Sequence, residues 1–299
     1  METNAPEIGF LGSPVETDVS SFDADVAILG VPHGWPYPRP GTTAGCALAP
    51  SAIRRRSRRM ARFRDHWDFD LDGPMRLRTF VDAGDVPGSV ADGPGNSERT
   101  TESVRSILER GAIPVCLGGD DSVPIPIIRA FDGRGPLIIL QVDAHLDYRD
   151  EVEGVREGYS SPMRRASEMP HVERIVQVGL RGVGSARPSD VDEARAAGNL
   201  LVTARELRER GVPWLLGQVP PDASVFISFD CDGLDPSVLP AVSAPAPGGL
   251  SYPEAWDLLA GIRSRLAGAV FTEYVPELDV NEVSALTITR LVCGLIART

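Results

Sequence analysis

The chain has 299 residues and a net charge of −12, from 30 Lys and Arg against 42 Asp and Glu. An acidic surface repels phosphate groups, so we expect neither nucleic acid nor an anionic membrane as the main partner. No apolar run reaches the roughly 18 residues that suggest a membrane span, and the length suits a single α/β domain.

The four cysteines, Cys46, Cys116, Cys231 and Cys293, lie far apart in the sequence and form no CxxC pair. This spacing argues against a zinc site or a disulfide framework and favours a reducing cytoplasm. The first twenty residues carry four acidic side chains and lack the apolar segment of a secretory signal. We therefore expect a cytoplasmic protein.

In chain order, an irregular segment is expected at 1–23, followed by a single catalytic domain over 24–299. Short apolar runs there have the length and the Val, Ile, Leu and Phe content of buried parallel strands. They lie at 25–31, 77–84, 112–119, 136–145, 174–180, 199–204, 224–232 and 268–275. Amphipathic stretches between them predict helices at 50–64, 98–110, 188–197, 204–210, 252–266 and 283–297. This alternation predicts parallel βαβ units and a three-layer α/β/α fold.

Local signals refine the prediction. Ser251 and Glu254 form a possible capping box at the start of one helix, and Ser51 and Ser97 lie near two other expected starts. Loops rich in Pro and Gly at 32–50, 86–96 and 233–249 follow predicted strands and are expected to be active-site loops. The basic run at 53–64 is expected to be a solvated helix face or a subunit contact.

Acidic residues and one histidine follow three of the predicted strands. They are Asp120 and Asp121; Asp143, His145 and Asp147; and Asp230, Asp232 and Asp235. Ligands of open α/β sheets bind beyond the carboxyl ends of the strands, so these clusters are expected to converge. Residues two apart on a strand share a face, which pairs Asp143 with His145 and Asp230 with Asp232. Asp235, before Pro236, is expected to be a turn residue.

So many carboxylates repel one another unless they take up protons or bind cations. Oxygen ligands with one imidazole suit a hard or borderline ion such as Mn²⁺. Two metal ions sharing carboxylates would use all of these ligands and hold a nucleophilic hydroxide. The sequence therefore predicts a binuclear metal site.

At these motifs the chain resembles the ureohydrolase family, which includes arginase and agmatinase. The family patterns GGDHS, DAHxD and SxDxDxxDP correspond to GGDDS (118–122), DAHLD (143–147) and SFDCDGLDP (228–236). Further similarity lies in PRPGTTAG and PSAIR (38–54), VDAGDV (81–86) and EYVP (273–276).

The resemblance implies an arginase-like eight-stranded parallel sheet, a homo-oligomer that is a trimer or hexamer, and two Mn²⁺ per chain, with Ni²⁺ or Co²⁺ as other options. The implied ligands are Asp121, Asp143, His145, Asp147, Asp230 and Asp232. The implied reaction is attack of a bridging hydroxide on a small cationic guanidino, amidine or formimino substrate. Asp147 would also orient the hydroxide, and Glu273 would bind the cationic NH₂ groups.

The chain departs from the family pattern at two positions. Asp121 stands where the family has His, which lowers the charge of the site by one unit and should reduce its power to activate water. Tyr159, in GYSSPMRRA (158–166), stands where agmatinases carry a proton-shuttling His. With a reference pKa of about 10, tyrosine is a poor base at neutral pH but can donate a hydrogen bond.

His33 follows the first predicted strand and is a candidate proton carrier or substrate ligand, with a loop-packing role as the alternative. Tyr159, Ser160, Ser161 and Trp35 are expected substrate contacts, although loop packing explains Trp35 equally well. His66 and His171 are expected to be structural or exposed. Arg164 and Arg165 would meet a substrate carboxylate or pair with acidic neighbours.

Three functions fit these residues. The first is an agmatinase-like hydrolase that releases urea and an amine. The second, suggested by the two missing histidines, is a weak or inactive subunit that binds ligand or completes a hetero-oligomer. The third, a deacetylase-like hydrolase with one Zn²⁺, fits less well because Asp121 and Asp147 supply a second metal position.

Overall fold

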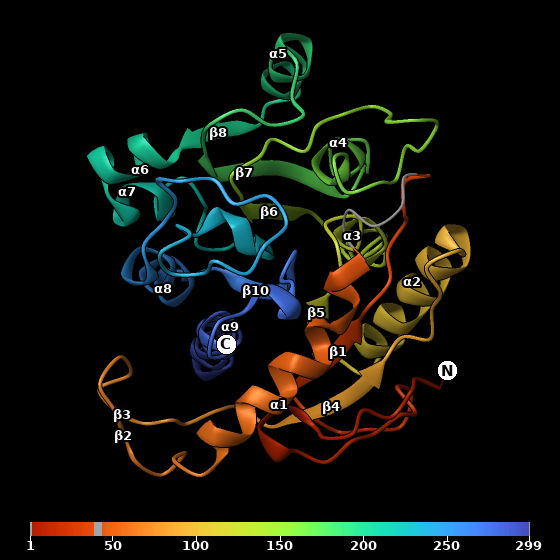
Figure 1. The fold of residues 1–299 in the computed structure, drawn as a ribbon, viewed down its shortest axis with the longest axis vertical. Coiled ribbons are helices and arrows are strands. Elements are labelled where there is room, and N and C mark those ends of the chain that lie inside the picture. The colour runs from red at the N-terminus through yellow and green to blue at the C-terminus, as the bar shows by residue number, and fades with distance from the viewer. Residues whose placement is uncertain (1, 39–43, 299) are drawn as a thin grey trace.

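The computed structural model describes residues 2–38 and 44–298, and its central sheet lies between two layers of helices (Figure 1). The eight strands lie in the order β4-β1-β5-β10-β9-β6-β7-β8, and every neighbouring pair is parallel. The predicted three-layer α/β/α fold with an eight-stranded parallel sheet is confirmed. Residues 39–43, part of the loop that resembles the family's RPG segment, lie outside the described residues.

Each predicted apolar run overlaps one strand of the sheet. These strands are β1 (Val26–Val31), β4 (Phe80–Asp85), β5 (Ile113–Gly118), β6 (Leu137–Val142), β7 (Val172–Leu180), β8 (Leu200–Thr203), β9 (Ser224–Asp230) and β10 (Arg265–Thr272). The six predicted helices correspond to α1 (Ala49–Ala61), α2 (Gly93–Glu109), α5 (Pro188–Ala196), α6 (Ala204–Arg210), α8 (Tyr252–Gly261) and α9 (Val283–Arg298).

The sequence did not predict the shortest elements, because one or two turns show no clear periodicity. These are α3 (Pro124–Arg129), α4 (Pro162–Ser167), α7 (Val212–Leu216), the hairpin β2 (Trp67–Asp68) and β3 (Gly73–Pro74), and four 3-10 turns, η1 (Phe10–Gly12), η2 (Ala44–Leu48), η3 (Cys231–Gly233) and η4 (Pro276–Leu278).

The capping signals were right at one of the three helices. Ser251 Oγ accepts the Glu254 N–H at 3.3 Å, and the Glu254 carboxylate accepts the Ser251 N–H at 2.8 Å, which is the predicted capping box. The structure instead starts α2 five residues before the predicted position, with Asp92 as the cap that accepts the Gly95 N–H at 3.0 Å. Leu48 precedes α1, so Ser51 lies inside that helix.

Apolar side chains cover both faces of the sheet because the strands are buried on both sides. Ile28 of β1 packs into the core layer beneath α1, α8 and α9, whereas its neighbours Ala27 and Leu29 pack beneath α2 and α3. The N-terminal segment also reaches this core, since Phe10 is fully buried. The division of the chain at residue 24 stays a prediction.

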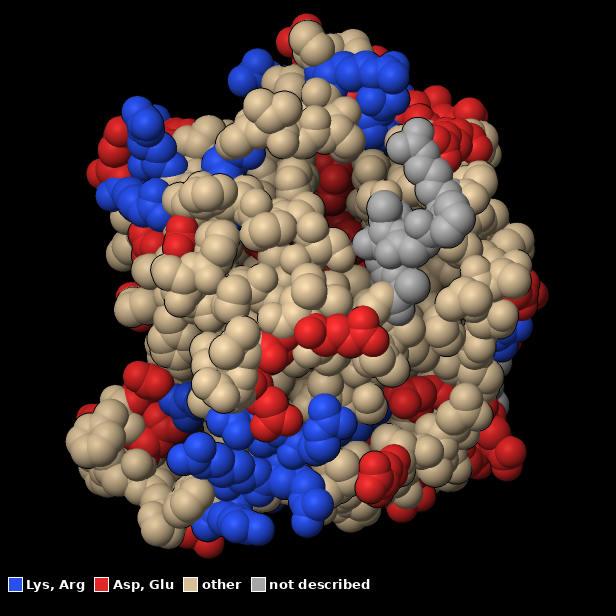
Figure 2. Space-filling view, in the orientation of Figure 1, with Lys and Arg blue, Asp and Glu red and all other residues tan. Residues whose placement is uncertain are grey.

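The basic run at 53–64 is not simply a solvated face, which corrects the sequence-based expectation. Arg54 of α1 is fully buried and contacts Asp82 through Nε at 2.8 Å and Nη2 at 2.9 Å, and it also pairs with Asp85. The solvated face is found at Arg55, Arg58 and Arg59, which are exposed, and Figure 2 shows basic side chains gathered over this part of the surface. The alternative of a subunit contact stays a prediction.

Candidate metal centre

Four neighbouring strands of the sheet, β5, β10, β9 and β6, bring acidic residues to one edge. Asp121 follows β5, Glu273 follows β10, Asp230 ends β9, and Asp143 follows β6. Because these strands are parallel and adjacent, their carboxyl ends converge. Acidic side chains are visible inside a hollow of the face shown in Figure 2.

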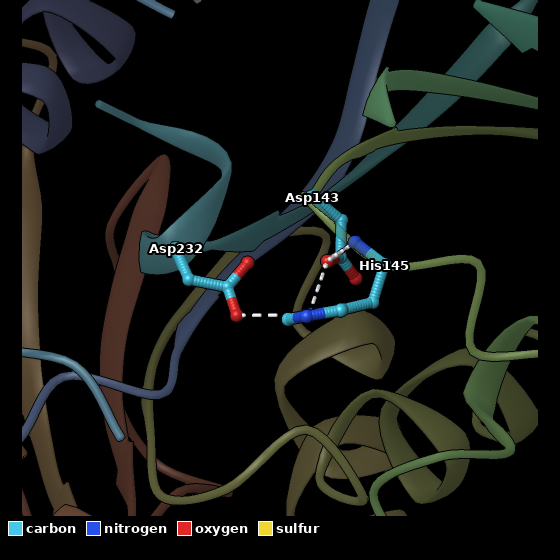
Figure 3. A group of neighbouring side chains, drawn as sticks. All are labelled: Asp143, His145 and Asp232. Atoms are coloured by element: carbon cyan, nitrogen blue, oxygen red, sulfur yellow. Dashed lines mark hydrogen bonds and ion pairs between the residues drawn. The ribbon is translucent and has the colours of Figure 1, made fainter. Parts of the chain in front are cut away.

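Asp143, His145 and Asp232 form the first cluster of candidate ligands, and each offers an atom within 4.8 Å of the others. The His145 imidazole lies between the two carboxylates (Figure 3), with Nδ1 3.0 Å from Asp232 Oδ2 and 3.6 Å from Asp143 Oδ1. The turn after β6 holds this arrangement, because the His145 N–H donates to Asp143 Oδ1 at 2.5 Å. Asp143 and His145 therefore lie close together as expected, but in the turn after β6 rather than on the strand itself.

Asp121, Asp143, Asp147 and Asp230 form the second cluster, again within 4.8 Å of one another, and all four are buried. Asp143 belongs to both clusters, so one carboxylate joins the two positions. The Thr272 hydroxyl donates to Asp121 Oδ1 at 2.7 Å, whereas Asp121 Oδ2 is buried without a hydrogen-bond partner. Asp147 has a left-handed backbone, with φ of 46°.

Burial and mutual repulsion disfavour the charged forms of these carboxyl groups. Burial is the largest cause that raises the pKa values of Asp121, Asp143, Asp147 and Asp230, and neighbouring carboxylates raise them further. The contacts with Asp143 and Asp232 raise the pKa of His145 to about 11. Without cations, these carboxyl groups therefore favour their protonated forms.

This donor set fits divalent cations. Across residues 2–38 and 44–298, no ion pair with arginine involves Asp121, Asp143, Asp147 or Asp230, and His145 is the basic side chain that contacts Asp143. Asp121 Oδ2 is buried without a hydrogen-bond partner, and Asp121 offers an oxygen within 4.8 Å of ligand atoms of the other three aspartates. Carboxylate oxygens with one imidazole match Mn²⁺ and similar ions better than ions that prefer thiolates.

Glu273 lies beside the clusters and is held rigidly. Its Oε1 accepts the Asp121 N–H at 2.8 Å, its own N–H donates to the Gly119 carbonyl at 2.9 Å, and its φ is 63°. The Cys46 thiol donates to Oε2 at 3.7 Å. Burial raises the pKa of Glu273 to about 8, with Asp120 as the next contributor. A cation placed against this carboxylate would favour its charged form.

The predicted substrate loop lies against the segment after β1. The Tyr159 ring is 4.4 Å from the Tyr37 ring, centroid to centroid, and Tyr37 Oη accepts the Ser160 N–H at 3.2 Å. Tyr37 leaves no room for a side chain at Gly158, where a Cβ would lie 2.0 Å from a ring carbon. Ser161 is fully buried, and its hydroxyl has no hydrogen-bond partner.

His33 and Trp35, in the segment after β1, contact neighbouring loops. His33 is half-buried and packs against Gly88, and burial lowers its pKa although the charge of Asp120 opposes this. The Trp35 N–H donates to Ser122 Oγ at 2.7 Å, and its indole packs on Gly93 at the start of α2. These contacts favour the loop-packing alternative for Trp35 and leave the role of His33 a prediction.

The remaining polar candidates have structural contacts. Arg164 pairs with Glu168 and Glu193, and Arg165 pairs with Asp150 at 2.7 Å, so both take the acidic-neighbour alternative. Asp235 accepts the Ser237 N–H at 3.0 Å, as expected of a turn residue. Likewise, His171 Nε2 lies 2.9 Å from the Ile128 carbonyl oxygen, and His66 is exposed.

Sequence reasoning missed several residues that support the site. The Arg181 guanidinium donates to the backbone carbonyls of Asp232 at 2.6 Å and of Leu234 at 3.1 Å, which braces the turn that carries Asp232. Gln141 and Gln177 are fully buried in strands, and Gln141 contacts Asp143. A glutamine inside an otherwise apolar run is the signal that identifies such residues, because a buried amide needs partners.

The sequence also led to expectations about disulfide bonds and membrane spans. The four cysteines are unpaired and buried. In the described ranges, no helix is both long and apolar enough to cross a bilayer.

Comparison with known proteins finds relatives in the family that the motifs resemble. The sequence profile of the Arginase family matches residues 24–297. The chain is 32% identical to mitochondrial agmatinase of Gallus gallus over 281 residues, covering 91% of this chain and 80% of the relative. It is also 32% identical to guanidinopropionase of Pseudomonas aeruginosa over 286 residues, covering 93% and 86%.

A solved structure shares the fold over almost the whole length. Proclavaminate amidino hydrolase from Streptomyces clavuligerus superposes with a TM-score of 0.86 at 27% identity, covering 98% of this chain and 97% of that one. Together with the converging carboxylates, these matches show that the chain belongs to the arginase family of ureohydrolases.

Proposed function

We propose that the protein is an agmatinase-like hydrolase that depends on two divalent cations and cleaves a guanidino or related amidine C–N bond, releasing urea and an amine. The observation that carries this proposal is the pair of ligand clusters that share Asp143, next to the buried carboxylate of Glu273. Membership of a family of hydrolases that act on guanidino C–N bonds supports the reaction class.

Asp143, His145 and Asp232 would hold one cation, and Asp121, Asp143, Asp147 and Asp230 would hold the other. When bound, two such cations supply activation of water for attack on a trigonal carbon. Mn²⁺ is the proposed ion, since the donor set is mainly carboxylate. A single-Zn²⁺ deacetylase-like site would leave the second cluster unexplained.

The other residues bind, orient and move protons. Glu273 would bind the cationic NH₂ groups of the substrate, because it is a buried acceptor fixed by the backbone of Asp121 and Gly119. Asp147 would orient the attacking water by accepting its hydrogen bond. Tyr159 would donate a hydrogen bond near the leaving amine, and His33, whose pKa is lowered, would accept a proton as a neutral imidazole.

A turnover assay tests the proposal. The protein is stripped with a chelator, reloaded with Mn²⁺, Ni²⁺ or Co²⁺, and incubated with agmatine, arginine, guanidino acids of three and four carbons, and formimidoylglutamate. We expect metal-dependent release of urea, or of formamide from the formimino compound, with a matching amine. Two bound cations per chain without product from any compound would favour the alternative of a ligand-binding subunit.

We also propose a homo-oligomer in the cytoplasm. Phe63, Trp67 and Phe69, in and beside the β2–β3 hairpin, are 50%, 59% and 90% exposed, and contiguous apolar surface of this kind often marks an interface. The hairpin projects from the body of the molecule (Figure 1). Light scattering after size-exclusion chromatography tests this, and a monomer at micromolar concentration would contradict it.

A further inference from the structure

A row of buried amide side chains leads from the outer strand β8 to the shared carboxylate of the metal centre. Asn199 precedes β8, Gln177 lies in β7, and Gln141 lies in β6, where it is the register partner of Gln177. Both glutamines are fully buried, and Asn199 is 8% exposed. The sequence places each amide at a position where an apolar residue would otherwise suit the core.

The hydrogen bonds in this row run in one direction. Asn199 Nδ2 donates to Gln177 Oε1 at 3.2 Å, Gln177 Nε2 donates to Gln141 Oε1 at 2.6 Å, and Gln141 Nε2 donates to Asp143 Oδ2 at 2.6 Å. Gln177 Nε2 also donates to the Leu146 carbonyl at 2.8 Å. Every step therefore points a donor toward Asp143.

The direction of these hydrogen bonds does not depend on which amide atom is assigned as nitrogen and which as oxygen. The Leu146 carbonyl can only accept, so the Gln177 atom that faces it must be the NH₂ group. The second proton of that NH₂ group then needs an acceptor, which is the Gln141 oxygen. The Gln141 NH₂ group is left to face Asp143, and a row of aligned amides of this kind polarises each member.

Both oxygens of Asp143 are fixed as a result. Oδ2 accepts from Gln141, and Oδ1 accepts the His145 N–H at 2.5 Å. A carboxylate oxygen has two lone-pair sites, so each oxygen keeps one for a cation. Asp143 is also the residue that the two ligand clusters share, so its orientation sets both positions at once.

We propose that Gln141 and Gln177 are positioning residues that hold the Asp143 carboxylate in the orientation needed to serve both cations. This inference rests on the proposed function, because it assumes that cations bind at the two clusters. Residues that support metal ligands in this way typically contribute about tenfold to hundredfold to metal affinity.

The first experiment measures Mn²⁺ binding by calorimetry to Gln141→Leu and to Ser228→Ala. Ser228 of β9 is the register partner of Gln141 on its other side, is fully buried, and has a hydroxyl without a hydrogen-bond partner. We expect Gln141→Leu to weaken Mn²⁺ binding about tenfold to hundredfold and to weaken the magnetic coupling of two Mn²⁺ ions in electron paramagnetic resonance. Ser228→Ala should bind Mn²⁺ like the native chain.

In a second variant, Gln177→Met, Gln141 is still present and can still contact Asp143. Its amide loses the hydrogen bond from Gln177 Nε2 that fixes its orientation. Gln177→Met should also lower Mn²⁺ affinity, with the melting temperature of the chelated protein showing that the variant folds. Native affinity and coupling in Gln177→Met, or in a folded Gln141→Leu, would overturn the inference. Absence of Mn²⁺ binding to the native chain would instead overturn the proposed function.

Discussion

Thr272 donates its hydroxyl hydrogen to Oδ1 of Asp121 at 2.7 Å, while Oδ2 of the same carboxylate has no hydrogen-bond partner. Asp121 is therefore oriented by the end of β10, and its second oxygen is left without a hydrogen bond. This geometry suits a ligand that replaces the histidine of the family pattern. The difference in charge between Asp and His predicts how the replacement changes the pH dependence of activity.

Asp121→His should shift the rise of kcat with pH toward lower pH. Replacing a carboxylate by a neutral imidazole raises the charge of the site by one unit, so water is activated at lower pH. Steady-state kinetics between pH 6 and 10 with saturating Mn²⁺ measure the shift. Asp121→Asn is the control that removes the same charge without supplying a nitrogen ligand. An unchanged pH profile of kcat in metal-loaded Asp121→His would refute the charge argument.

Glu273→Gln should raise KM for a cationic guanidine by at least about tenfold, because the charged hydrogen bond to the substrate is lost. Mn²⁺ content should not change, since Glu273 lies outside both ligand clusters. Glu277→Gln, at an exposed position four residues away, is the control and should behave like the native chain. Loss of bound metal in Glu273→Gln would show that its role is not substrate binding.

The chelated protein should lose stability as pH rises. The folded state raises the pKa values of the buried aspartates and raises that of Glu273 to about 8, so it retains protons that the unfolded chain releases above about pH 4. The stabilising contribution is complete below that pH and is lost as pH rises through the folded pKa values. His145, with a pKa of about 11, changes stability in the same direction above pH 6.5.

Melting temperatures in excess chelator from pH 5 to pH 8 test this sign. We expect a steady decrease, with a shallower slope in Asp121→Asn because one titrating carboxyl group is removed. Saturating Mn²⁺ should reverse the trend, since bound cations compete with protons. A melting temperature that rises with pH in the chelated native chain would contradict the proposed proton occupancy.

His33→Ala should lower kcat/KM by at least about tenfold and remove an acidic limb from the pH profile, as expected for a group that carries a proton. His66→Ala, at the exposed hairpin, is the matched histidine control. If His33→Ala retains the native kcat/KM and pH profile, His33 serves only to pack its loop against Gly88.

Arg54→Met should destabilise the protein by about 3–5 kcal/mol, because it leaves the buried Asp82 carboxylate without its partner. Arg58→Met on the exposed part of α1 should change stability by less than about 0.5 kcal/mol. Urea unfolding of the metal-loaded variants measures both. Equal stability of the two variants would show that the buried contact contributes no more than an exposed arginine.

The sequence was sufficient to predict the sheet, because the apolar runs alternate with helical patterns, and to predict that acidic residues converge, because three of the runs end in Asp. The assignment of these residues as metal ligands stays a prediction. It could not reveal that Arg54 is buried, since this depends on Asp82 and Asp85 of β4 packing beneath α1. The row from Asn199 to Gln141 also required the register of β6 and β7. The segment of Tyr159 and the short helix α4 that follows it lack a periodic pattern, so the sequence could not predict that Tyr159 packs on Tyr37.

The left-handed backbones of Asp147 and Glu273 have a consequence for protein engineering. A non-glycine residue in this conformation costs about 1–2 kcal/mol relative to its preferred geometry. Thermostability screens will therefore tend to select Asp147→Gly or Glu273→Gly, which relieve the strain and discard the chemistry. Libraries designed to improve heat resistance should keep both codons fixed.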